Sequence, residues 1–347
     1  MTGKKIKVII IDDSIMFRET LRRGISGDPF IEVVETASDP YDATEKIQNY
    51  APDVLTLDVE MPRMNGIEFL KKLIPQYPVP VVVVSSLPIN VFEALDAGAV
   101  DFVRKPAIKS PKDMEAFISE LITKIKIASA AKVGQKHAAS RASYSTASFT
   151  GVQNKIIAIG ASTGGTEATQ TVIKDLPITT PGIVIVQHMP ANFTRMYAER
   201  LDKICKMSVK EAKNGDRVSQ GQILIAPGEF QMRLAKDSSG YYVKVQQGEK
   251  VSGHCPSVDV LFESVADVAG DNAIGVILTG MGSDGAKGLL KMRKAGANTI
   301  GQDKASSVVY GMPMVAFNIG AVEKQVSIDD VAQTICSFFK NNQKCVP

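Results

Sequence analysis

The sequence predicts two α/β domains, each built on a parallel β-sheet with helices on both faces. Short apolar runs rich in β-branched residues alternate with helix-like segments through both halves of the chain, which is typical of parallel sheets. Between the halves, residues 130–151 are rich in Ala and Ser and contain no acidic residue, which is typical of a flexible tether. The 347 residues also exceed the usual span of one hydrophobic core, about 250–300 residues. The predicted division is a first domain at residues 1–125, a flexible linker at 126–153 and a second domain at 154–347.

The composition excludes several classes of protein. A hydrophobic content of 44% and a charged content of 22% are ordinary for a globular protein, and a net charge of +3 is too small to favour nucleic acid or membrane surfaces. No apolar stretch reaches the ~20 residues of a membrane span, and the first residues do not form a secretory signal. The four cysteines lack metal-binding or disulfide spacing. We therefore expect a cytoplasmic monomer with free thiols that neither binds nucleic acid nor inserts into a membrane.

Polar residues follow the apolar strands of the first half, at the points where those strands end. Five of them are Asp12, Asp13, Asp58, Ser85 and Lys105. In a parallel sheet these strand ends meet at one edge, where ligands bind. Converging carboxylates repel one another, so the cluster favours a hard divalent cation with oxygen ligands, and Lys105 adds a further positive charge.

The first half resembles the receiver domain of bacterial two-component response regulators. The motifs IIIDDS, TLDVEMPRMNG, VVVVSS and DFVRKP carry this resemblance, in this order, over about residues 5–125. It implies a flavodoxin-like five-stranded fold and phosphoryl transfer from a histidine kinase onto Asp58. The site roles that it implies are Mg²⁺ ligation by Asp13, Asp58 and the backbone carbonyl of Glu60, support of these ligands by Asp12, phosphoryl contacts from Ser85 and Lys105, and a switch aromatic at Phe102.

The second half begins with the stretch KIIAIGASTGG, a short buried strand that runs into a glycine-flanked turn with Ser162 at its tip. A serine in such a turn can be a nucleophile, with the backbone N–H of Thr163 as an oxyanion donor. The same turn can instead bind a phosphate group at the start of a helix. The turn lacks the lysine of a P-loop and the full spacing of a dinucleotide site.

Three strand ends of the second half present Ser162, His188 and Asp284. A weak serine nucleophile requires a base, and the chain contains only three histidines. His137 lies in the predicted linker. His188 directly follows an apolar strand, whereas His254 lies in a loop with no adjacent apolar run. We therefore expect His188 to be the base and Asp284 to orient its imidazole, while the phosphate-binding interpretation gives His188 no role.

The remainder of the second half is predicted in less detail. Turn signals between short strands over residues 209–242 indicate a small antiparallel insertion. After the strand at 298–301 we expect a loop and one closing helix. A DNA-binding output domain is disfavoured, because the sequence has no evident helix-turn-helix and no basic stripe.

The second half resembles the catalytic domain of chemotaxis protein-glutamate methylesterases, the CheB family. The motifs IGASTGG, VIVQHMP, GHCPSVDVLF, ILTGMGSDGA and YGMP carry this resemblance over about residues 154–345. It implies a doubly wound, mostly parallel sheet and hydrolysis of glutamate γ-methyl esters, with possible deamidation of glutamines, on the cytoplasmic helices of methyl-accepting chemoreceptors. The implied roles are nucleophile for Ser162, general base and acid for His188, orienting carboxylate for Asp284, and oxyanion donors at Thr163 and Met281. No cofactor is implied for the esterase site. One departure is Cys255, where a basic residue is expected.

The order of a receiver, a tether and an enzyme suggests regulation. Our hypothesis is that the unphosphorylated receiver blocks access to Ser162. Phosphorylation of Asp58 would then shift the equilibrium toward an open arrangement.

Overall fold

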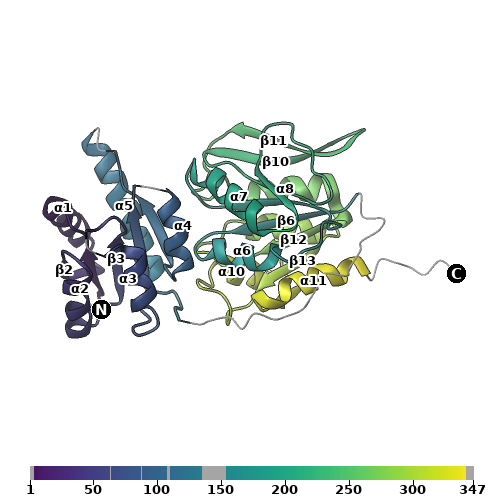
Figure 1. Ribbon diagram of the computed structural model, residues 1–347. Coiled ribbons are helices and arrows are strands. Elements are labelled where there is room, and N and C mark those ends of the chain that lie inside the picture. Colours follow the sequence, from purple (N-terminus) through teal and green to yellow (C-terminus); the bar gives the residue numbers. More distant parts are fainter. Residues whose placement is uncertain (1–3, 63, 87, 108–109, 135–153, 341–347) are drawn as a thin grey trace. The chain divides into compact units, whose positions relative to one another are not determined.

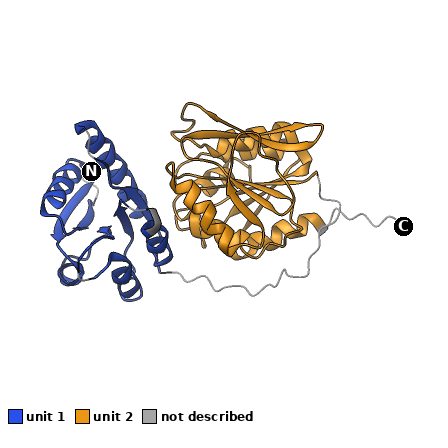
Figure 2. Cartoon of the chain, turned by 45° about the horizontal axis from the view of Figure 1, so that its top comes forward, with its two compact units in different colours: residues 1–136 blue, residues 137–347 orange. Residues whose placement is uncertain are grey.

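The computed structural model describes residues 4–340 except 63, 87, 108–109 and 135–153. The chain divides into two compact units, Met1–Lys136 and His137–Pro347 (Figure 2). The point of division lies inside the predicted linker at 126–153. Most of that linker, including His137, lies outside the described residues, and its first part belongs to the helix that ends at Ala128.

The first unit contains a five-stranded parallel sheet in the order β2-β1-β3-β4-β5. Its strands are β1 (Ile6–Ile11), β2 (Ile31–Ala37), β3 (Val54–Asp58), β4 (Val81–Ser85) and β5 (Asp101–Arg104). Strands β3 and β4 are buried along their whole length, as expected for central strands covered on both faces. The expected flavodoxin-like architecture is confirmed.

Four helices connect these strands and a fifth follows β5, and several of the five begin at a polar capping residue. They are α1 (Ile15–Ser26), α2 (Pro40–Tyr50), α3 (Gly66–Leu73), α4 (Pro88–Asp96) and α5 (Pro111–Ala128). Ser14, Asp39 and Asn65 each accept a hydrogen bond from a backbone N–H of the first helical turn. Helices α1 and α5 contact each other, and α3 contacts α4. Among the described residues, no helix is both long enough and apolar enough to cross a membrane.

The second unit contains a seven-stranded sheet in the order β14-β13-β12-β6-β7-β9-β8, with every neighbouring pair parallel. Its strands are β6 (Ile156–Ala161), β7 (Gly182–Gln187), β8 (Ser208–Glu211), β9 (Gln222–Ile225), β12 (Ala273–Ile277), β13 (Asn298–Gln302) and β14 (Lys324–Val326). Strands β6, β7 and β12 lie side by side at the centre and are fully buried. Their carboxyl ends place the candidate site.

Helices cover both faces of this sheet, so the predicted doubly wound α/β class is confirmed. They are α6 (Gly165–Ile173), α7 (Phe193–Ile204), α8 (Val258–Ala269), α9 (Ala286–Lys294), α10 (Met312–Asn318) and α11 (Ile328–Lys340), with a short 3₁₀ turn at Gly270–Asn272. Helices α8, α9 and α10 share one apolar core with alternate residues of the central strands, and α6 packs against α11.

Two details of the prediction are wrong. The segment at 209–242 is not wholly antiparallel, because β8 and β9 extend the main sheet as parallel strands. Only β10 (Phe230–Asp237) and β11 (Gly240–Gln247) form an antiparallel hairpin, which packs beside α8 (Figure 1). The turn signals belong partly to the connection between β8 and β9, whose backbone hydrogen-bonds to β11. The chain also ends with α10, β14 and α11 rather than with one helix.

Candidate active site

The register of two central strands places Ser162 and His188 next to each other. Strand β6 pairs with β7 so that Ala161 lies opposite Gln187. Ser162 and His188 are the residues that follow this last pair. The backbone N–H of His188 donates a hydrogen bond to the carbonyl of Ala161 at 3.1 Å, which continues the ladder to this point. The two side chains therefore leave neighbouring strand ends.

Strand β12 lies on the other side of β6 and brings a second loop to Ser162. The backbone N–H of Ser162 donates to the carbonyl of Thr279 at 3.0 Å. A Cβ atom added to Gly280 would lie 2.7 Å from Cβ of Ser162 and 2.4 Å from Sδ of Met312. Only glycine fits at this position without moving Ser162. The loop then continues to Asp284, which precedes α9.

Asp284 is buried and accepts four hydrogen bonds. Its Oδ2 atom accepts from Nε2 of His188 and from the backbone N–H of Val258, both at 2.8 Å. Its Oδ1 atom accepts from the Ser257 hydroxyl at 2.8 Å and from the backbone N–H of Asp259 at 3.0 Å. A carboxylate offers about four acceptor sites, so this one is saturated. Three of the donors belong to the start of α8, where the helix dipole also favours a negative charge.

The surroundings of Asp284 decide which ring nitrogen of His188 faces it as a hydrogen-bond donor. Burial alone would raise the pKa of Asp284, but the hydrogen bond and charge of His188, together with the α8 donors, outweigh burial and hold that pKa below its usual value. An ionised carboxylate only accepts hydrogen bonds, so Nε2 of neutral His188 must carry the proton. Among the described residues, Nδ1 of His188 is buried and has no hydrogen-bond partner. Its lone pair is therefore available to a nearby hydroxyl group.

Backbone N–H groups flank Ser162 on two loops. Thr163 follows Ser162 directly, and Gly164 adopts a left-handed conformation (φ 74°) that turns the chain into α6. Helix α6 begins three residues after Ser162 and has no side-chain cap, and the backbone N–H of its first residue, Gly165, donates to the carbonyl of Ser162 at 2.7 Å, so the positive end of its dipole lies beside the serine. Met281 follows Gly280 on the other loop, and its side chain is exposed. Both predicted oxyanion donors, Thr163 and Met281, thus lie on chain segments adjacent to Ser162.

Gln187 links the two strand ends that carry Ser162 and His188, and it was not identified from the sequence as a site residue. Its side chain is buried, and Nε2 donates to the carbonyl of Ser162 at 2.9 Å and to that of His188 at 3.3 Å. A Cβ atom on Gly165 would lie 2.3 Å from Oε1 of Gln187, so the amide packs tightly under the turn. Its place between an apolar strand and His188 is the signal that could have identified it.

His254 was also missed as part of the site. Its ring stacks on that of His188 with a centroid separation of 3.7 Å and an interplanar angle of 10°. The rarity of histidine pointed to it, but the absence of a neighbouring apolar strand argued against it. Three residues later, Ser257 holds Asp284. Between them, Cys255 donates weakly to the carbonyl of Gly248 at 3.7 Å, and burial raises the pKa of its thiol.

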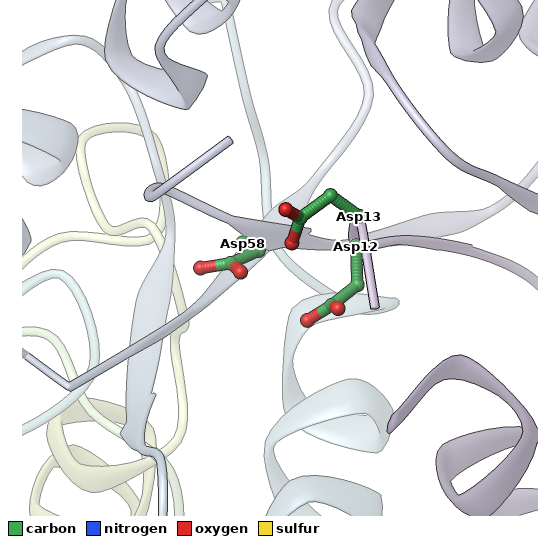
Figure 3. A group of neighbouring side chains, drawn as sticks. All are labelled: Asp12, Asp13 and Asp58. Atoms are coloured by element: carbon green, nitrogen blue, oxygen red, sulfur yellow. The ribbon is translucent and has the colours of Figure 1, made fainter. Parts of the chain in front are cut away.

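The first unit holds a separate acidic cluster at the ends of β1 and β3. Asp12, Asp13 and Asp58 present carboxylate oxygens that lie within 4.8 Å of one another (Figure 3). Asp12 and Asp58 are buried, and Asp13 is exposed. The Lys105 ammonium, on the loop after β5, lies 2.9 Å from Oδ2 of Asp12 and 2.5 Å from Oδ2 of Asp58. Its cationic head also lies 4.8 Å from the centre of the Phe17 ring.

One ammonium does not neutralise three carboxylates. Burial raises the pKa of Asp12, and the negative charge of Asp58 adds to this, against the hydrogen bond and charge of Lys105. Burial opposes the charged form of Lys105, but Asp58 and Asp12 outweigh it and raise the Lys105 pKa. This oxygen-rich, net negative donor set fits a hard divalent cation such as Mg²⁺.

The other predicted residues of the first unit lie around this edge of the sheet. Ser85 is the last residue of β4 and is fully buried, and its carbonyl accepts from the backbone N–H of Lys105 at 3.0 Å. The backbone N–H of Glu60 donates to Oδ1 of Asp58 at 3.1 Å. Phe102 lies within β5, and its side chain is buried. The carboxylates, Ser85 and Lys105 therefore gather where the four neighbouring strands β1, β3, β4 and β5 end.

Comparison with known proteins identifies a family for each unit. The family described as CheB methylesterase matches residues 157–335, and the family described as response regulator receiver domain matches residues 8–118. The crystal structure of the Thermotoga maritima CheB methylesterase catalytic domain is similar to the second unit, with a TM-score of 0.52 and 36% identity, over 53% of this chain and 98% of that one.

Similar proteins match almost the whole chain. A protein-glutamate methylesterase/protein-glutamine glutaminase 2 from Syntrophomonas wolfei is 60% identical over 335 residues, which cover 96% of this chain and 98% of that protein. A protein-glutamate methylesterase/protein-glutamine glutaminase from Syntrophotalea carbinolica is 52% identical over 350 residues, with coverage of 98% and 99%. The similarity therefore spans both units together.

Proposed function

Because the chain belongs to the CheB methylesterase family, we propose that its second domain hydrolyses γ-methyl esters of glutamate side chains with Ser162 as the nucleophile. Methyl-accepting chemoreceptors are the substrates, and their cytoplasmic helices carry the modified residues. The same site deamidates glutamine side chains to glutamate. The observation that carries this proposal is the 2.8 Å hydrogen bond from His188 to a saturated Asp284, beside the strand end that carries Ser162.

Acylation of Ser162 follows from this arrangement. His188 accepts the hydroxyl proton at Nδ1 while the Ser162 oxygen bonds to the ester carbonyl carbon. Asp284 keeps its hydrogen bond to Nε2 and stabilises the imidazolium. The backbone N–H groups of Thr163 and Met281 receive the negative charge that develops on the carbonyl oxygen. The bond to the methoxy oxygen then breaks, and methanol leaves with the proton from Nδ1.

Hydrolysis of the acyl-enzyme repeats these roles with water. His188 takes a proton from the water as its oxygen attacks the acyl carbon, and it returns that proton to Ser162 as the ester bond breaks. The product is the glutamate side chain. With glutamine as substrate, the first leaving group is ammonia, and the later steps are the same.

For the first domain we propose phosphorylation of Asp58 by a chemotaxis histidine kinase in the cytoplasm. Mg²⁺ would be held by Asp13, Asp58 and the backbone carbonyl of Glu60, with Asp12 supporting them. The clustering of carboxylate oxygens within 4.8 Å supports this assignment. The ion supplies positive charge that lets an anionic phosphoryl group approach a carboxylate.

Ser85 and Lys105 would bind the phosphoryl oxygens, and the packing of Phe102 would follow the phosphorylation state. Phosphorylation then shifts the equilibrium between a less active and a more active arrangement of the two domains. No cofactor is assigned to the ester-hydrolysing step.

A phosphate-binding turn at Ser162 remains the alternative from another class. The uncapped start of α6 supports it, since such N–H groups attract anions. It offers no reason for the hydrogen bond between His188 and Asp284 or for the buried Nδ1 atom. The esterase accounts for both.

The test is methanol release from methylated receptor, with and without acetyl phosphate as phosphodonor. We expect activity in the unaltered chain to rise with the donor, Asp58→Ala to abolish that rise, and Ser162→Ala to lose activity under both conditions. Equal rates for the unaltered chain and Ser162→Ala would contradict the serine mechanism and direct attention to nucleotide binding.

A further inference from the structure

We propose that His254 is a positioning residue for the catalytic base, holding the His188 imidazole in the plane that directs Nδ1 to Ser162. This inference rests on the proposed function and adds a residue to its machinery. It starts from the stacked pair of rings, with centroids 3.7 Å apart and planes within 10° of parallel. At this separation the two faces are in van der Waals contact.

The His188 ring needs such a constraint because its hydrogen bond to Asp284 does not by itself fix the plane of the ring. Nε2 is tied to Asp284, whereas Nδ1 has no partner among the described residues. Rotation of an imidazole about its second side-chain torsion has broad minima, so a single hydrogen bond leaves the ring free to tilt around it. A flat neighbour against its face removes that freedom.

The backbone of His254 is held firmly enough to act as a support. Its N–H donates to the carbonyl of Val251, and its carbonyl accepts from the N–H of Val251, both at 2.9 Å. The carbonyl also accepts from Nε2 of Gln231 at 3.3 Å. Gln231 lies on β10, and its side chain is buried. The position of the His254 ring is thus tied to the hairpin.

The same short segment reaches both partners of the catalytic hydrogen bond. His254 covers the face of His188, and Ser257 donates to Asp284 at 2.8 Å. Gln231 links the two ends of the segment, because its Oε1 atom accepts from the backbone N–H of Ser257 at 2.9 Å. Residues 254–257 therefore orient the base and its carboxylate together, which is how a productive geometry is held by its surroundings.

Small misplacements of a catalytic group reduce rate rather than binding. A displacement of about 1 Å can cost ~100-fold in rate. We expect His254→Ala to lower kcat about 10- to 100-fold with little change in KM. His254→Phe restores a flat ring without the ring nitrogens, so it should recover most of the lost kcat. Val251→Ala is the matched control in the same turn, since it keeps the backbone pair with His254, and it should behave as the unaltered chain.

Nitrogen-15 NMR of the imidazoles gives a readout that loss of stability would not produce. The chain has only three histidines, so assignment of His188 is direct. We expect a single Nε2–H tautomer in the intact chain and in His254→Phe. In folded His254→Ala we expect exchange-broadened or averaged His188 signals.

The outcomes separate this inference from the function on which it rests. An unchanged kcat in His254→Ala, or equal losses in the Ala and Phe variants, would overturn the stacking role. If Ser162→Ala loses activity while the His254 variants give either of these results, the proposed esterase function stands and only the stacking role is wrong. Undiminished activity in Ser162→Ala would instead overturn the proposed function itself.

Discussion

The two polar clusters of this chain both lie at the carboxyl ends of parallel strands, but they differ in how well their carboxylates are matched by cations and hydrogen-bond donors. At the ends of β1 and β3, three carboxylates face one lysine, and the buried Asp12 resists ionisation. At the ends of β6, β7 and β12, the carboxylate of Asp284 has a donor for each acceptor site and remains ionised. The first cluster is suited to gaining and losing charge, as a phosphorylation switch requires. The second is suited to keeping one arrangement through a reaction cycle.

The largest expected effect comes from disturbing the balanced cluster. Asp284→Asn places an amide opposite Nε2 of His188, so the imidazole no longer holds its proton there and Nδ1 loses its basic lone pair. We expect kcat for methanol release to fall by ~10⁴-fold, as for the equivalent change in other triads.

Asp267→Asn is the control for this prediction. Asp267 lies on α8, is largely exposed and pairs with Lys291, so its removal should leave kcat within about twofold of the unaltered chain. A fall of less than tenfold in Asp284→Asn would contradict the role given to the carboxylate.

Ser257→Ala sharpens the comparison, because it removes one of the four donors and leaves the catalytic groups in place. A hydrogen bond to a charged acceptor contributes about 1.5–3 kcal/mol, part of which would appear in the free energy of unfolding. Ser257 also caps α8, since its hydroxyl accepts from the N–H of Val260. We expect a lower unfolding temperature for the second unit and a kcat reduced about tenfold. An unchanged thermal transition by calorimetry would show that Asp284 does not need a full set of donors.

In the unbalanced cluster, removing a carboxylate should stabilise the fold. Asp12→Asn keeps the shape of the side chain and removes its negative charge. Burial disfavours this charge and raises the pKa of Asp12. We expect the free energy of unfolding of the first unit to rise in metal-free protein, because the variant removes a buried charge that Asp58 repels. Denaturant unfolding of the full chain in a chelator measures this. A loss of stability would show that the bond from Lys105 outweighs the repulsion.

The smallest expected effect is the pH dependence, which should have opposite sign in the two units. The pKa of Asp12 is raised on folding, so its contribution to stability is full below the unfolded pKa, near 4, and is lost as pH rises through the folded value. The pKa of Asp284 is lowered, so its contribution is present above about pH 4 and is lost as pH falls through the folded value.

Differences in melting temperature between the unaltered chain and each Asn variant, followed from acidic to neutral pH in a chelator, isolate these two contributions. Slopes of the same sign would contradict the contrast between the clusters.

The fold class could be predicted because the strands and helices of a parallel α/β protein leave short, local patterns in the sequence. Each apolar run with its polar terminus identifies a strand and the end that carries ligands, so Ser162, His188 and Asp284 could be chosen as candidates without coordinates. Their roles as catalytic residues stay predictions. The parallel pairing of β8 and β9 was not foreseen, because turn residues reveal where a chain bends and not which strand it joins next.

Most contacts that support the site could not be predicted from the sequence either, because they join segments that are far apart in the chain. His254 meets His188 across 66 positions of sequence through the packing of one loop, which no local pattern encodes. Ser257 carried a visible signal, since serine before an apolar helix is a typical cap. That signal predicts a helix start but not the carboxylate that the helix start binds.

The most direct test of the central claim is covalent labelling of the intact chain with a fluorophosphonate, followed by peptide mass spectrometry. An activated serine attacks phosphorus and releases fluoride, so we predict one adduct, on Ser162, that is absent in Ser162→Ala and strongly slowed in Asp284→Asn. No adduct in the unaltered chain, or an adduct on a different serine, would contradict the assignment of Ser162 as the nucleophile activated by His188 and Asp284.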